Sequence, residues 1–130
     1  MREKPLILLV DDEMNFLEII STKLGASGFD VVVAHNAAEA MDAAKKINPD
    51  LILMDISMPG ETGTDAALAI KQNALTKDIK IAFLSNMKDP WPRTTTPRDV
   101  LAQEMGMEDF IDKAADLDVI AGKVRSILGK

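Results

Sequence analysis

The sequence predicts an α/β fold, a doubly wound five-stranded parallel sheet with helices on both faces. Two observations lead to this prediction. Short apolar runs recur along the chain and several of them stop abruptly at a polar residue, while the segments between them carry apolar residues at helical spacing. Runs of this kind are typical of strands buried on both faces of a parallel sheet. Repeated alternation of strand and helix predicts right-handed crossovers in one open sheet.

Five apolar runs are the predicted strands. The first ends at Asp11 and Asp12, the third at Asp55 and the fourth at Ser85, and Lys113 follows the fifth. The predicted strands are Leu6–Val10, Val31–Ala34, Leu51–Met54, Ile81–Leu84 and, more weakly, Met107–Ile111.

The segments between the runs have the spacing of amphipathic helices. In the second of them, alanine, methionine and isoleucine side chains recur every three or four residues, which forms an inward-facing stripe. Asn36 is placed to cap this helix, and Glu39 three residues later completes a variant of the capping box. The predicted helices are Met14–Leu24, Ala37–Ile47, Thr64–Leu75 and Leu117–Leu128, with a further one opening at Thr96–Pro97.

One irregular stretch interrupts this alternation. Residues Lys88–Pro97, with the sequence KDPWPRTTTP, contain three prolines in ten residues and are predicted to form a loop. Two interpretations remain open, a stiff flap that tunes access to a neighbouring site and a surface insertion without a role.

Composition limits the classes of function. The 130 residues have the size of a single domain, spanning 1–130, and 47% of them are hydrophobic, enough for a buried core. With 15 basic and 21 acidic residues the net charge is −6, which argues against nucleic-acid or membrane binding by a basic surface. Cysteine is absent, and the first apolar run is too short for a membrane span or signal peptide. We expect a soluble cytoplasmic protein.

Polar residues gather at the carboxyl ends of the predicted strands, where open parallel sheets bind their ligands. Asp11, Asp12, Asp55, Ser85 and Lys113 all occupy such positions. Each one alone could be a helix cap or a loop residue. Three neighbouring carboxylates, however, repel one another and need a compensating cation. An all-oxygen acidic site with open positions suits Mg²⁺.

Four motifs carry a resemblance to a known family. They are VDDE near the start, LMDISMPGETG around the third predicted strand, FLSN at the fourth and DFIDK at the fifth. In this order and at strand ends they resemble the CheY-like receiver domain of two-component response regulators, over essentially the whole chain. The resemblance implies a flavodoxin-like receiver fold and a phosphoprotein that works in phosphorelay signal transduction.

The resemblance also implies a role for each matching residue. Asp55 resembles the aspartate that accepts a phosphoryl group from a histidine kinase or phosphotransfer protein before the signal passes to a downstream partner. Lys113 and Ser85 resemble the groups that contact the phosphoryl oxygens, and Phe110 together with Ser85 the pair that switches conformation. The Mg²⁺ ligands implied are Asp11, Asp12, Asp55 and the backbone carbonyl of Ser57.

Other functions were weighed against this one. The chain would be a signalling domain rather than an enzyme, although it would assist its own phosphotransfer and dephosphorylation. A degenerate receiver that binds a partner without phosphorylation is the alternative, and the intact set of site residues weighs against it. An aspartate-dependent phosphatase usually carries a second Asp two residues after its nucleophile, where this chain has Ser57. One departure from the family pattern is Ala114, which follows Lys113 where receivers usually have proline.

Overall fold

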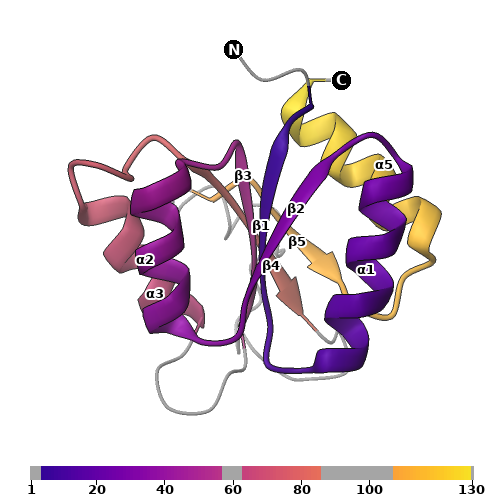
Figure 1. The fold of residues 1–130 in the computed structure, drawn as a ribbon, viewed down its shortest axis with the longest axis horizontal. Helices are drawn as coiled ribbons and strands as arrows, with labels where there is room; N and C mark the ends of the chain where they lie inside the picture. Colours follow the sequence, from indigo (N-terminus) through magenta and orange to yellow (C-terminus); the bar gives the residue numbers. More distant parts are fainter. Residues whose placement is uncertain (1–3, 57–62, 86–106, 130) are drawn as a thin grey trace, which may run out of the picture.

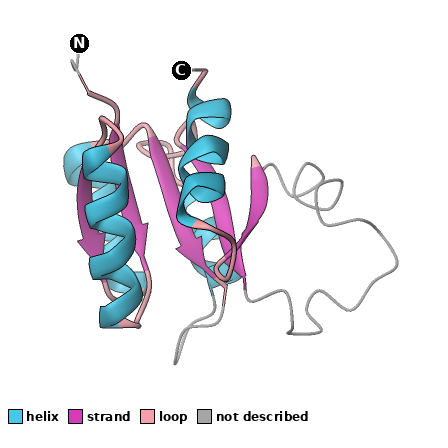
Figure 2. Ribbon diagram, turned by 90° about the vertical axis from the view of Figure 1, so that its right-hand side faces the viewer, coloured by secondary structure: helices cyan, strands magenta, loops and turns pink. Residues whose placement is uncertain are grey.

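The computed structural model, which describes residues 4–56, 63–85 and 107–129, confirms the predicted architecture. Five strands form one sheet in the order β2-β1-β3-β4-β5, every neighbouring pair is parallel, and helices cover both faces (Figures 1 and 2). The strands are β1 (Leu6–Val10), β2 (Asp30–Ala34), β3 (Leu51–Asp55), β4 (Lys80–Ser85) and β5 (Asp109–Asp112). The helices of the described part are α1 (Met14–Ala26), α2 (Ala37–Ile47), α3 (Gly63–Gln72) and α5 (Leu117–Leu128).

Two apolar cores lie on the two faces of the sheet. Successive side chains of a strand point to opposite faces, so each strand contributes to both cores. Leu9 and Leu53 pack with residues of α1 and α5, while Leu8 and Ile52 pack with residues of α2 and α3. Figure 1 shows these two pairs of helices on either side of the sheet. Apart from the first residues of β1 and β4, the three central strands are therefore buried, as their apolar sequences predict.

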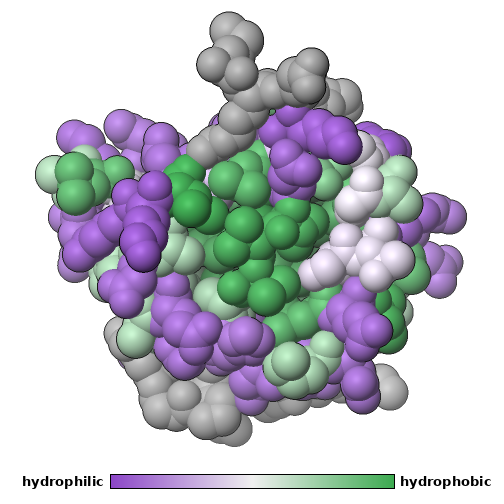
Figure 3. Space-filling model, viewed as in Figure 1, coloured by the Kyte–Doolittle hydropathy of each residue, from purple (hydrophilic) through white to green (hydrophobic). Residues whose placement is uncertain are grey.

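The prediction that every strand is buried on both faces is wrong for β2. Val32 and Val33 are 37% and 39% exposed, because β2 is an edge strand that pairs only with β1 among the described strands. Figure 3 shows the apolar area that results in the middle of this side of the molecule. An apolar run in the sequence indicates strand propensity and partial burial, but it does not say whether the strand lies inside or at the edge of a sheet.

Several predicted boundaries also shift by one to three residues, among them the end of α3 and the start of β5. Helix α3 ends at Gln72 rather than Leu75, because the Asn73 carboxamide accepts a hydrogen bond from the Leu75 amide (2.9 Å) and starts a turn. Strand β5 begins at Asp109 rather than Met107, whose side chain is already buried in the core on the α2 and α3 face. The loop Lys88–Pro97 and the helix predicted from Thr96–Pro97 lie outside the described residues.

Local hydrogen bonds fix the start of α2 as the sequence predicts. The Asn36 Oδ1 atom accepts a hydrogen bond from the Glu39 amide (2.9 Å), and its Nδ2 group donates to the Glu39 carboxylate (2.7 Å). The same carboxylate contacts His35 Nδ1 at 3.0 Å, and this hydrogen bond lowers the pKa of Glu39. In the part of the chain that the structure describes, no helix has the length and hydrophobicity needed to cross a membrane.

Removal of the Asn36 cap should weaken the fold. We expect Asn36→Ala to lower the free energy of unfolding by about 1 kcal/mol, since the Glu39 amide loses its partner. Chemical denaturation measures the change. Asn36→Asp is the matched control, because aspartate keeps an acceptor at the same place and should stay close to the original stability. Equal stability of the alanine variant would show that the cap contributes nothing.

Candidate functional site

The predicted site residues lie at the carboxyl ends of the strands, where the hydrogen bonding of the sheet ends. The Asp11 amide donates to Ala34 O (3.1 Å), which extends the pairing of β1 with β2, and the Lys113 amide donates to Ser85 O (3.0 Å), which extends that of β4 with β5. Asp55 is the final residue of β3, in register with Leu84. The backbone of each residue is thus held by the same ladder of hydrogen bonds that holds the core strands.

The alternation of side chains places three of these residues on one side. Asp11 continues the series of Ile7 and Leu9, and Asp55 continues that of Leu51 and Leu53, all of which belong to the core beneath α1 and α5. By the same rule Lys113 follows Ile111 onto this face.

Ser85 occupies the other face of the sheet by the same alternation. It continues the series of Ile81 and Phe83, which pack in the core beneath α2 and α3. The side chain is buried, with 5% of the residue exposed. Lys113 and Ser85 therefore lie on opposite faces of the sheet at its carboxyl edge.

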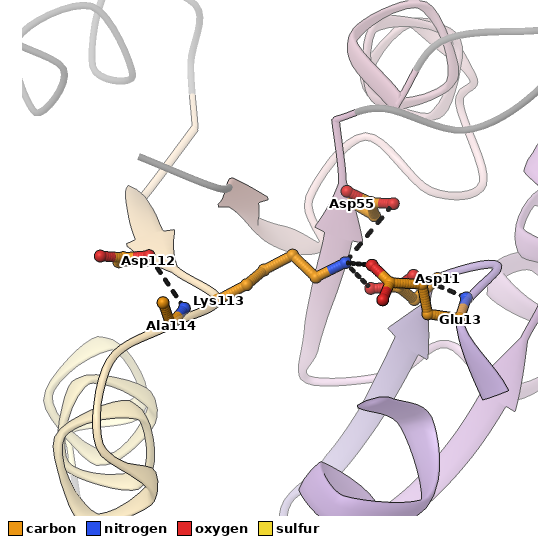
Figure 4. A network of polar contacts seen from close by, with 6 residues as sticks. All are labelled: Asp11, Glu13, Asp55, Asp112, Lys113 and Ala114. Carbon is orange, nitrogen blue, oxygen red and sulfur yellow. Dashed lines mark hydrogen bonds and ion pairs between the residues drawn. The ribbon is translucent and has the colours of Figure 1, made fainter. Parts of the chain in front are cut away.

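Lys113 is the centre of the polar contacts. Its Nζ atom lies 2.7 Å from Asp11 Oδ2, 2.6 Å from Glu13 Oε1 and 3.9 Å from Asp55 Oδ2. Figure 4 shows the lysine reaching from the segment after β5 across to the ends of β1 and β3. On another side the ammonium stands 4.6 Å from the centroid of the Phe16 ring, a cation–π contact. The Lys113 ammonium thus lies within ion-pair distance of three carboxylates.

Burial strengthens these interactions and shifts the ionisation of the groups. The side chain of Asp11 is fully buried, and those of Asp55 and Lys113 are 6% and 12% exposed. Burial raises the pKa of Asp11, although contact with Lys113 acts in the opposite direction. Burial alone would lower the pKa of Lys113, but its contacts with Asp11 and Glu13 and the charge of Asp55 outweigh that effect and raise it. The lysine therefore stays an ammonium ion.

The donor atoms fit a divalent cation. Asp11, Asp12 and Asp55 each offer one carboxylate oxygen, and these three oxygens lie within 4.8 Å of one another. Asp11 Oδ2 is buried and, apart from its ion pair with Lys113, accepts no hydrogen bond of regular geometry from the described residues. Asp12 is exposed, which leaves an open side towards solvent. Hard oxygen ligands with free positions are the set that Mg²⁺ prefers.

Two predicted residues cannot be placed in this arrangement. Ser57 lies outside the described residues, so its backbone carbonyl remains a predicted ligand. Phe110 lies in β5, in register with Phe83, but its side chain is outside the described part of the structure. Its switching role likewise remains a prediction.

Three further residues at the site were missed from the sequence. Glu13 pairs with Lys113, Phe16 lies against its ammonium, and Asp112 shapes the segment after β5. Glu13 could have been noticed as the third acidic residue of the VDDE motif. The lysine lies 100 residues from Glu13 in the sequence. Their pairing depends on the tertiary structure and cannot be predicted from sequence spacing.

The turn that carries Lys113 is closed by a side chain. The Asp112 Oδ1 atom accepts a hydrogen bond from the Ala114 amide at 2.9 Å, an Asx turn across the lysine (Figure 4). Proline could not donate this bond. The alanine found where receivers usually have proline thus makes a contact that proline would remove.

The strand order and the acidic strand ends define the class of this protein, an α/β domain of flavodoxin-like topology with its site at the β1/β3 switch point. Within that class, residues 7–125 match the family model of the response regulator receiver domain, and the chain belongs to this family. It is a receiver domain of two-component signal transduction, a family in which an aspartate typically accepts phosphate and an acidic pocket binds Mg²⁺. Receiver domains interact with histidine kinases and downstream effectors.

This chain is similar to parts of known proteins that differ in kind and in length. It is 35% identical to the CAI-1 autoinducer sensor kinase/phosphatase CqsS of Vibrio cholerae, over 95% of this chain and 17% of that protein. It is 30% identical to the DNA-binding response regulator MtrA of Mycobacterium tuberculosis, over 94% of this chain and 50% of that protein. The chain spans half or less of the length of these curated relatives. A putative response regulator from Chloroflexus aurantiacus superposes with a TM-score of 0.84 at 25% identity, covering 98% of this chain and 100% of that one.

The Asx turn yields a prediction about Ala114. We expect Ala114→Pro to lower the free energy of unfolding by about 1 kcal/mol, because the hydrogen bond to Asp112 is lost. Ala114→Ser is the control, since it keeps the amide donor at this exposed position. Chemical denaturation compares the two variants. A proline variant as stable as the serine variant would contradict a stabilising role for the turn.

Proposed function

We propose that Asp55 is the phosphoacceptor of this receiver domain and that Asp11 and Asp12, with Asp55, hold the Mg²⁺ on which the transfer depends. The observation that carries the proposal is the position of the Asp55 carboxylate, which has an oxygen within 4.8 Å of carboxylate oxygens of Asp11 and Asp12 and its Oδ2 atom 3.9 Å from the Lys113 ammonium. Phosphoryl transfer asks a protein mainly for positioning and for neutralisation of charge. This site has groups for both.

The proposed reaction is a direct displacement. A carboxylate oxygen of Asp55 attacks the phosphorus of a phosphohistidine, an O–P bond forms, and the P–N bond breaks with its electron pair leaving on the imidazole nitrogen. A carboxylate is already ionised near neutral pH, so the nucleophile needs no general base. The product is an acyl phosphate on Asp55. The same surroundings would then assist its hydrolysis by water.

The remaining groups have supporting roles in this proposal. Lys113 pairs with an oxygen of the phosphoryl group, and Ser85 approaches it from the opposite face of the sheet. Bound Mg²⁺ supplies further positive charge to the anionic oxygens. The expected switch is movement of Ser85 towards the phosphoryl group with Phe110 moving inward, a shift in population driven by contacts that exist in only one state.

The proposed partners follow from the chemistry. The phosphodonor is a histidine kinase or a phosphotransfer protein, and a downstream protein reads the switched surface. The relatives include a DNA-binding response regulator and a sensor kinase/phosphatase, so the similarity supports the receiver role without selecting one output. The cytoplasmic location expected from the sequence stays a prediction.

Substitution of the nucleophile tests the proposal directly. With Mg²⁺ and a small phosphodonor such as acetyl phosphate, the intact mass of the protein should increase by one phosphoryl group, and Asp55→Asn should abolish the increase because an amide is a poor nucleophile. Asp42→Asn, an exposed position on α2, is the matched control and should take up phosphate normally. Phosphate uptake by the Asp55 variant would refute the assignment.

Metal binding makes a separate prediction. A ligand that binds only the folded state stabilises it, by about 2.7 kcal/mol at a hundred times its dissociation constant. Mg²⁺ should therefore raise the melting temperature, and EDTA should reverse the rise. Asp12→Ala should largely abolish the effect, whereas Asp42→Ala should preserve it. If the Asp12 variant responds to Mg²⁺ as strongly as the original protein, the site is misplaced.

A further inference from the structure

The Lys113 ammonium is bound more closely by Glu13 than by the proposed phosphoacceptor. Its distance to Glu13 Oε1 is 2.6 Å, against 3.9 Å to Asp55 Oδ2, which is beyond hydrogen-bonding range. An ammonium has three protons to donate. In the structure the ammonium donates a hydrogen bond to Glu13 and forms an ion pair with Asp11, on the β1 and α1 side of the site (Figure 4).

Glu13 is itself held in place for this contact. Its backbone amide donates to Asp11 Oδ1 at 2.9 Å, so the two acids form a turn at the start of α1. Asp11 then binds the Glu13 backbone with one oxygen and faces Lys113 with the other, while the Glu13 side chain closes the ring on the same ammonium. The turn between Asp11 and Glu13 thus places both carboxylates beside the Lys113 ammonium.

The Glu13 side chain can nevertheless release the lysine at small cost. It is 64% exposed, so water can solvate its carboxylate when the ion pair opens, whereas Asp11 is fully buried and depends on Lys113. An open surface pocket of about 220 Å³, lined by Glu13, Phe16, Lys113 and Ala114, adjoins the contact, so water reaches it.

From this geometry we propose that Glu13 is a positioning residue, which holds the Lys113 ammonium on the α1 side in the unphosphorylated protein and competes for it with a phosphoryl group on Asp55. The proposal rests on the proposed function of Asp55. A contact made in one state and lost in the other shifts the equilibrium between them. Glu13 therefore stabilises the unmodified state and weakens the hold of the site on phosphate.

The test is the affinity of the protein for beryllofluoride in the presence of Mg²⁺, because this ion imitates a phosphoryl group on a carboxylate and binds reversibly. Glu13→Gln should bind it about two- to fivefold more tightly than the original protein, the range expected for loss of one exposed ion pair. Titration followed by ¹⁹F NMR or calorimetry measures the change. Circular dichroism checks that the variant is folded.

Two controls separate competition for the lysine from a general effect of charge. Glu18→Gln removes a negative charge from α1, but Glu18 is not among the carboxylates within 4.0 Å of the ammonium. The affinity of this variant for beryllofluoride should therefore equal that of the original protein. In a Lys113→Met background, Glu13→Gln should no longer change the affinity, since the shared partner is gone.

The outcomes are distinct. If the original protein binds beryllofluoride and Glu13→Gln binds it equally well or more weakly, Glu13 does not compete for Lys113, and the proposed function of Asp55 stands. The same conclusion follows if the gain persists without Lys113 or is matched by Glu18→Gln. If the original protein binds no beryllofluoride and takes up no phosphate, the proposed function is wrong and this inference falls with it.

Discussion

Two buried carboxylates sharing one ammonium are the constraint on which the rest of this site depends. Asp11 and Asp55 are brought together by the parallel sheet, and burial makes their mutual repulsion costly. Lys113 offsets part of that cost. Its attraction to the neighbouring carboxylates also raises its own pKa. With the exposed Asp12 and Glu13 included, the site has four carboxylates and one ammonium, so negative charge remains in excess. A site with this excess suits a divalent cation, which would offset the charge of an anionic phosphoryl group in the proposed function.

The fold supports these charges by continuing the sheet up to them. The backbones of Asp11 and Lys113 are bonded to neighbouring strands, and the core residues Leu9, Leu53 and Ile111 lie directly before the site residues on the same face. The groups are thereby fixed on rigid elements, which is how precise electrostatic sites are built. Stability comes from the apolar strands, and the charged residues at their ends are available for function.

The sequence was sufficient for the architecture and for the gathering of Asp11, Asp12, Asp55 and Lys113 at one edge of the sheet, for a physical reason. Apolar runs that stop at Asp11, Asp55 and Ser85 report both the strands and the edge at which their ends meet, because parallel strands align their carboxyl ends. The features that the sequence did not predict depend on contacts between residues in the folded structure. The exposure of β2 follows from its place at the edge of the sheet, and the early end of α3 follows from one hydrogen bond of Asn73. The pairing of Glu13 with Lys113 joins segments 100 residues apart.

The two ends of Lys113 are held in different ways, and this difference suits a switch. Its backbone is fixed by the bond to Ser85 and by the Asx turn of Asp112, whereas its ammonium rests on ionic contacts that can be exchanged. Because Glu13 occupies the N-cap position of α1 and Phe16 lies in its first turn, movement of the ammonium away from them towards Asp55 would remove contacts with the start of that helix. Charge at the end of β3 is thus coupled to the start of α1 through one side chain, and the core beneath need not rearrange.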